Sequence, residues 1–158
     1  MKRFPLTLWP AAVPPLLGLL SGSLIAPPLL WPDTATGLLS WRHFARGGTW
    51  NTLPLPDPVD IARTIETTVT WWSPGQAVPL GLLTSAGLPL GPSMLLIAFA
   101  SALVFAFGLA LLSRDLGAPE NGLPWIATGA TGCWSMLYAF GMFNGGEIAL
   151  ITVWPWIA

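Results

Sequence analysis

The chain has little charge, one cysteine and one histidine. Only 8% of its 158 residues are charged, whereas about a quarter are charged in a typical soluble domain. The formal net charge of -1 offers no basic surface for a nucleic acid, which is therefore not expected as a partner. A single cysteine, Cys133, excludes an internal disulfide and a thiolate metal cluster. The single histidine is the only imidazole that could bind a metal, so a divalent metal is not expected. No cofactor is predicted.

Long apolar runs take the place of the missing charge. They extend over Phe4–Pro32, Thr67–Ser113 and Asn121–Gly146 without a charged residue. Each exceeds the roughly 20 residues that cross a bilayer core, which predicts an integral membrane protein. Lys2 and Arg3 precede the first run, which is longer than the apolar core of a signal peptide. We therefore expect a retained anchor with a cytoplasmic N-terminus.

Prolines, glycines and charges divide these runs into segments. The predicted fold is all-α, with three complete transmembrane helices, an incomplete fourth, and short interfacial helices in the first large loop. A GxxxG pair, Gly18 and Gly22, and an alanine stripe from Ala98 to Ala110 predict close contacts between helices. The expected segments are a first span at about 6–30, a non-cytoplasmic loop at 32–75, a juxtamembrane or re-entrant helix at 76–88, spans at 92–113 and 123–143, and the start of a fourth at 147–158.

Most charged side chains gather in one segment between Asp33 and Glu66, which Trp71 and Trp72 close. Because apolar runs flank it on both sides, we expect this segment in water or at lipid headgroups. Alternation of the spans from a cytoplasmic N-terminus places it on the non-cytoplasmic side, at the plasma or inner membrane if the protein is bacterial.

Two short helices are expected inside this charged segment. Residues 38–46 have one apolar face, which suits a helix lying in the membrane interface and ended by the glycine pair that follows. Asp57 followed by Pro58 is typical of a helix N-terminus. The second helix would begin there and carry Ile61 and Ile65 on its apolar side.

Short motifs occur along the chain in a recognisable order. An apolar N-terminal run is followed by Asp33, then by Trp-Arg-His-Phe-Ala-Arg-Gly-Gly at 41–48, Trp-Ser-Pro-Gly at 72–75 and Leu-Ser-Arg-Asp-Leu-Gly at 112–117. In this order they resemble the N-terminal part of GT-C membrane glycosyltransferases, the group that contains protein mannosyltransferases and lipid A aminoarabinose transferases. The likeness covers most of this chain but only the first part of such an enzyme.

The resemblance implies transfer of a sugar, with inversion, from a polyprenyl-phosphate donor at the non-cytoplasmic membrane face. Asp33 would be catalytic and take the proton from the acceptor hydroxyl; the other interpretation is that it caps a helical turn near residues 34–37. Arg42, His43 and Arg46 would bind the phosphate of the donor. Their alternative is contact with the phosphates of ordinary lipid headgroups.

The other acidic residues also have two interpretations each. Glu147 is expected on the same side as the charged segment, where similar enzymes carry a polar or acidic residue that binds substrate. A carboxylate there is equally favoured by the dipole of the helix that it begins. Asp57, Asp60 and Glu66 offer oxygen ligands to a hard cation, although helix capping and solvation explain the two aspartates better.

The sequence therefore predicts a GT-C-like membrane glycosyltransferase fragment that is inactive as an isolated chain. Its expected partners are membrane lipids, a polyprenyl-phosphate-linked sugar, and further transmembrane helices from a missing portion or another chain. The alternative is a small non-catalytic integral membrane subunit that binds a partner complex through its polar loop. A transporter fragment is less well supported, because no charged residue lies in the middle of a predicted span.

Overall fold

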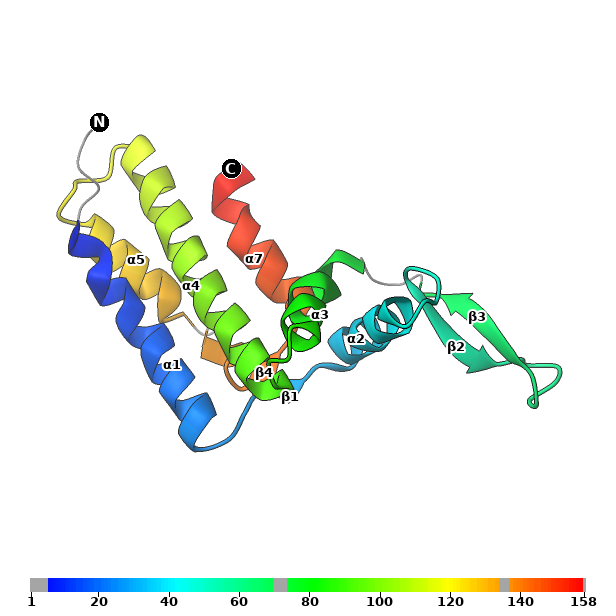
Figure 1. Cartoon of the computed structure of the whole chain (residues 1–158). Helices are drawn as coiled ribbons and strands as arrows, with labels where there is room; N and C mark the ends of the chain where they lie inside the picture. The colour runs from blue at the N-terminus through cyan, green and yellow to red at the C-terminus, as the bar shows by residue number, and fades with distance from the viewer. Residues whose placement is uncertain (1–5, 70–73, 134–136, 158) are drawn as a thin grey trace.

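The computed structural model describes residues 6–69, 74–133 and 137–157, and Figure 1 shows its helices and two small sheets. The elements in chain order are η1 (Leu6–Ala12), α1 (Val13–Leu24), β1 (Leu29–Leu30), α2 (Pro32–Ala45), β2 (Thr52–Pro56), β3 (Thr64–Thr68), η2 (Pro74–Ala77), α3 (Val78–Ser85), α4 (Leu90–Asp115), α5 (Leu123–Thr131), β4 (Met142–Phe143) and α7 (Gly145–Ile157).

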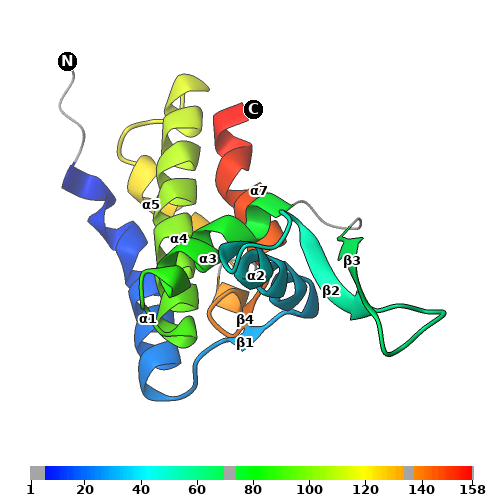
Figure 2. The same cartoon turned by 45° about the vertical axis from the view of Figure 1, so that its right-hand side comes forward.

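Helix α4 is the centre of the helical layer and contacts α1, α3, α5 and α7. It begins directly after Pro89, whose fixed φ and missing N–H suit the residue before a helix. It ends where Gly117 adopts a φ of +88°, a conformation that glycine reaches without steric cost. Helices α2 and α3 lie at the end of the layer where α4 begins, and β2 and β3 extend away from the layer (Figures 1 and 2).

The small residues of α4 let its neighbours approach closely. Ala98, Ala102, Ala106 and Ala110 are all buried, which confirms the predicted stripe. Ala106 and Ala110 belong to one small core cluster with residues of η1 and α5. The larger cluster lies nearer the start of α4 and contains, among the buried residues, Leu38, Leu80, Met94, Leu95, Ala98, Ala139, Phe140, Phe143 and Ile148.

Both glycines of the predicted GxxxG pair lie against bulky side chains. A Cβ on Gly18 would be 2.6 Å from the ring of Phe140, and one on Gly22 would meet the side chain of Leu95. The two glycines therefore give α1 close contact with two different elements, the segment before β4 and helix α4.

The all-α prediction is wrong, because the structure contains two two-stranded sheets. In one, Leu29 and Leu30 of β1 pair in parallel with Met142 and Phe143 of β4. In the other, β2 and β3 form an antiparallel hairpin, with Leu55 opposite Ile65. The first pairing joins residues more than a hundred positions apart, which no local pattern could reveal.

The second interfacial helix, predicted from Asp57 onward, is also wrong, because residues 52–68 form this hairpin. The Asp57 carboxylate accepts a hydrogen bond from the N–H of Val59 at 2.8 Å, and the Asp60 carboxylate accepts one from the N–H of Ala62 at 3.1 Å. In both turns an aspartate side chain accepts a hydrogen bond from the backbone N–H two residues later. This pattern occurs in loops as well as at helix N-termini. Four of the five residues of β3 are β-branched, which favours the strand.

Three complete transmembrane helices are likewise not found. Among the described residues, only Leu90–Asp115 is both long and apolar enough to cross a bilayer. The predicted first span ends early, since α1 stops at Leu24 before a proline pair. The span predicted at 123–143 is interrupted, because α5 ends at Thr131 and the chain is already in β4 at Met142.

Candidate functional site

Asp33 lies in the first turn of α2 and is half-buried. Its carboxylate accepts a hydrogen bond from the indole N–H of Trp31 at 3.0 Å. Trp31 occupies the N-cap position of α2, and no side chain caps that end of the helix. The predicted capping role of Asp33 is therefore not the arrangement found. A carboxylate in the first turn is instead favoured by the helix dipole.

The N-termini of α2 and α7 are held together by a buried hydrogen bond. The N–H of Gly145, the first residue of α7, donates to the hydroxyl of Thr34 at 2.9 Å. Asp33 precedes Thr34 in the chain, and Glu147 lies in the first turn of α7. Two of the predicted site residues thus belong to adjoining helix ends, although 114 positions separate them in the sequence.

Gln76 of η2 completes this region of the molecule. Its side-chain oxygen Oε1 is buried and has no hydrogen-bond partner among the described residues. The same oxygen would lie 2.7 Å from a Cβ on Gly146, so a side chain at that position would require the Gln76 amide to shift. We call the region formed by Asp33, Thr34, Gln76, Gly145 and Glu147 the acidic end of the site.

Arg42, His43 and Arg46 lie at the other end of α2, with both arginines exposed. Residues 33 and 42 are nine positions apart, which corresponds to about 14 Å along a helix. An attacking hydroxyl and a sugar carbon must approach to about 3.5 Å. The structure therefore does not bring Asp33 and the three basic residues together at one reaction centre.

His43 is partnered by the hairpin. Its Nε2 lies 2.9 Å from a carboxylate oxygen of Glu66, and the hydroxyl of Thr52 donates to the other oxygen at 3.4 Å. Hydrogen bonds from the side chains of Thr49 and then of His43 lower the pKa of Glu66. His43 thus links α2 to β3. This contact is made within the protein and needs neither a lipid nor a substrate.

A cluster of aromatic rings next to His43 strengthens the same junction. The ring centres of Trp41 and Phe44 lie 5.9 and 5.1 Å from that of Trp50, in edge-to-face arrangements. The indole N–H of Trp41 donates to the hydroxyl of Ser85 in α3 at 3.0 Å. On the predicted apolar face of residues 38–46, Leu38 is therefore buried and Trp41 half-buried, whereas Phe44 and Ala45 remain exposed.

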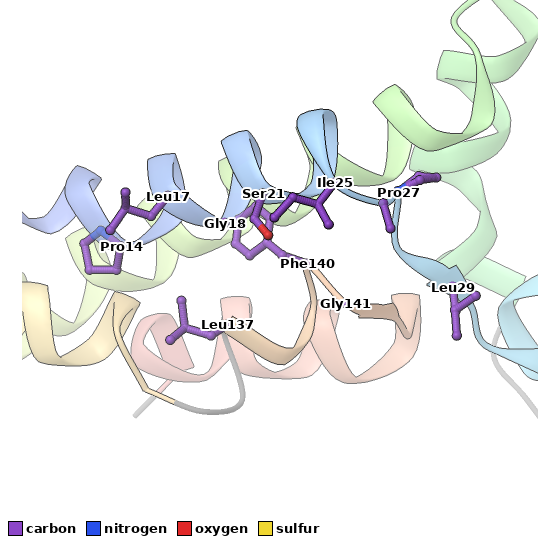
Figure 3. Close-up of a pocket in the computed structure, with 11 residues that line it drawn as sticks. Pro14, Leu17, Gly18, Ser21, Ile25, Pro27, Leu29, Leu137, Phe140 and Gly141 are labelled. Atoms are coloured by element: carbon purple, nitrogen blue, oxygen red, sulfur yellow. The ribbon is translucent and has the colours of Figure 1, made fainter.

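An open groove of about 790 Å³ runs between α1 and residues 137–141 (Figure 3). Its walls are apolar, and Phe140 forms part of the floor beside Gly18. It reaches from Pro14 to Leu29, four positions before Asp33. Sequence reasoning did not identify this groove, because its walls come from opposite parts of the chain.

Other predicted residues contribute less to a site. Asp57 and Asp60 lie in the hairpin loop, and no group of three histidine, cysteine or acidic side chains among the described residues is placed to hold a metal ion. Trp71 and Trp72 fall outside the residues that the structure describes. Gln76 and Thr34 were missed; the only sequence signal for their neighbourhood is the Gly145-Gly146 pair before Glu147.

Comparisons of the chain with family models, with curated proteins and with solved structures give no match.

Proposed function

We propose that this chain forms part of a GT-C-like membrane glycosyltransferase that acts on a polyprenyl-phosphate-linked sugar at the non-cytoplasmic face. The observation that carries the proposal is a contact at the acidic end of the site. The Thr34–Gly145 hydrogen bond there joins the two helix ends that bear Asp33 and Glu147. Two carboxylates on adjoining helix ends can divide the tasks of proton acceptor and hydroxyl-binding group.

The distribution of charge supports placement in a membrane. Within the described residues, the charged side chains lie at the two ends of α4: one group on α2, the hairpin and the start of α7, the other between Arg114 and Glu120. The 26 residues of α4 between them correspond to about 39 Å, enough for a bilayer core. Only 33% of the most apolar stretch of α4 is buried inside the molecule.

In the proposed reaction, the carboxylate of Asp33 accepts the proton of the acceptor hydroxyl as that oxygen bonds to the anomeric carbon. The bond from this carbon to the phosphate oxygen breaks, and the lipid phosphate leaves with the electron pair. Glu147 would accept a hydrogen bond from a sugar or acceptor hydroxyl. The apolar groove, which reaches Leu29, four positions before Asp33 in the chain, has room for part of the polyprenyl chain.

Arg42 and Arg46 are assigned to phosphates at the membrane surface, because they lie too far from Asp33 to share its reaction centre. The group that binds the leaving phosphate would then come from further membrane helices of the same or another polypeptide.

The test is Asp33→Asn in the complete protein, with sugar transfer from the lipid-linked donor measured in membranes. A general base contributes about 10²–10⁴-fold, so the rate should fall at least about 100-fold. Asp115→Asn is the matched control, because Asp115 is an exposed carboxylate at the far end of α4. Activity retained within a few-fold by the Asp33 variant would remove the proposed base.

A second candidate function is favoured by the hairpin. It extends away from the helical layer (Figure 2), and its loop exposes 96% of Val59 and 85% of Ile61. Two exposed apolar side chains on a projecting loop are typical of a contact with another protein. The chain would then be a non-catalytic membrane subunit, and replacing residues 58–61 by a short polar turn would release its partner without affecting the helices.

A further inference from the structure

The two outer edges of the β2–β3 hairpin differ in what they offer to another strand. Val69 donates its N–H to the carbonyl of Asn51, and Asp57 donates to the carbonyl of Arg63. Hydrogen-bonded pairs alternate along an antiparallel ladder, so the peptide groups of residues 53, 55, 65 and 67 face inward. The peptide groups of the intervening residues face outward, away from the partner strand.

On β2 two of these outward positions are Pro54 and Pro56. Proline has no N–H, and a strand edge that carries it cannot complete a ladder with a further strand. The outer edge of β2 is therefore closed to pairing by its own sequence. Helix α2 also packs against β2.

On β3 the outward positions are Thr64, Glu66 and Thr68, each with both a donor and an acceptor. Among the described residues, none forms a hydrogen bond with these six backbone groups. Thr64, Glu66 and Thr68 are also exposed. An unprotected strand edge of this kind is a template for a further strand.

We propose that the outer edge of β3 binds an extended, basic segment of another polypeptide as a third strand. This proposal concerns the hairpin alone and does not depend on sugar transfer at Asp33.

The charge of the hairpin indicates which kind of segment binds the outer edge of β3. The hairpin carries three carboxylates, Asp57, Asp60 and Glu66, against one cation, Arg63. A second copy of the chain, paired in the register that centres on Glu66, would place that carboxylate opposite its own copy, and like charges across a ladder are destabilising. A lysine or arginine opposite Glu66 is instead favourable.

The experiment uses the full chain in detergent and a blocked peptide of alternating valine and lysine, long enough to cover Thr64–Thr68. Binding is measured by fluorescence anisotropy of the labelled peptide. The edge-blocked variant is Thr64→Pro with Thr68→Pro, which mirrors the prolines of β2 and removes no hydrogen bond of the hairpin. The matched control is Thr64→Ala with Thr68→Ala, and hydrogen exchange of the Leu53 and Leu55 amides verifies that each hairpin is intact.

We expect the peptide to bind the wild type and the alanine control alike, and the edge-blocked variant at least about tenfold more weakly. Alternate N-methylation of the peptide should abolish binding. Equal affinity for the edge-blocked variant, or no binding to the wild type at about 1 mM peptide, a free energy near −4 kcal/mol, would overturn the proposal. A dimer of the wild type that the edge-blocked variant fails to form would also overturn it and assign the edge to a second copy.

Discussion

The helical layer and the hairpin are held together by different kinds of contact. In the layer, glycines and alanines bring helices close, and the contacts join distant parts of the sequence, as Gly18 and Phe140 do. In the hairpin, the contacts are short-range or cross to α2, and they include the polar pair of His43 and Glu66 beside the aromatic rings of Trp41, Phe44 and Trp50. We therefore expect added side-chain volume to destabilise the layer, and changes of charge to destabilise the hairpin.

The largest effect is expected from Gly18→Val in the layer. The added side chain would meet the buried ring of Phe140 at 2.6 Å from its Cβ, and overpacking of this kind costs about 2 kcal/mol of the free energy of unfolding. Thermal unfolding followed by circular dichroism in detergent measures the change. Hydrogen exchange of the hairpin amides should stay as in the wild type.

Gly129→Val is the matched control for this substitution, because a Cβ at Gly129 in α5 meets no atom within 4 Å. Its stability should be equal to or slightly above that of the wild type, since valine is a better helix former than glycine. Equal losses in both variants would mean that backbone propensity, and not the contact with Phe140, controls the layer.

A smaller loss is expected where the N-termini of α2 and α7 meet, from Thr34→Val. This substitution conserves shape but leaves the buried N–H of Gly145 without its acceptor, at a cost of about 1 kcal/mol, the lower end for an unpaired buried donor. Thr152→Val is the control: its hydroxyl donates to the carbonyl of Ile148 within α7, so its loss should change the free energy of unfolding by less than about 0.5 kcal/mol. Indistinguishable melting curves for the two variants would refute the role given to the Thr34–Gly145 bond.

Local sequence signals predicted part of the fold. The alanine stripe of α4 was predicted because alanine recurs every four residues along a single helix. The end of α2 was found because Gly47 takes a φ of +94° that glycine alone adopts freely. The hairpin was missed because Asp57-Pro58 has the same chemistry in a turn as at a helix start. Only the pairing of 64–68 with 52–56 decides between the two.

The candidate site was predictable one residue at a time but not as an arrangement. The sequence singled out Asp33 as a carboxylate just beyond an apolar run and predicted Glu147 on the same side, and the roles of both residues stay predictions. The contact between α7 and α2 through Gly145 and Thr34 spans 111 positions, and the buried oxygen of Gln76 lies 2.7 Å from where a Cβ on Gly146 would be. The single continuous length of α2 separates Asp33 from Arg42, His43 and Arg46, which the sequence had grouped.

The smallest effect concerns the hairpin and is its response to pH. Because the pKa of Glu66 is lowered in the folded chain, the ionised carboxylate stabilises the junction between the hairpin and α2 at pH values above its unfolded-state pKa of about 4.3. That contribution is lost as the pH falls through the lowered folded-state pKa, so the Leu53 and Leu55 amides should exchange faster, after correction for the intrinsic rate, in this acidic range. Glu66→Gln should remove the pH dependence, whereas Asp60→Asn in the loop should keep it. If the amides of α4 lose protection in step with those of the hairpin, the two regions unfold as one unit and the contrast between them fails.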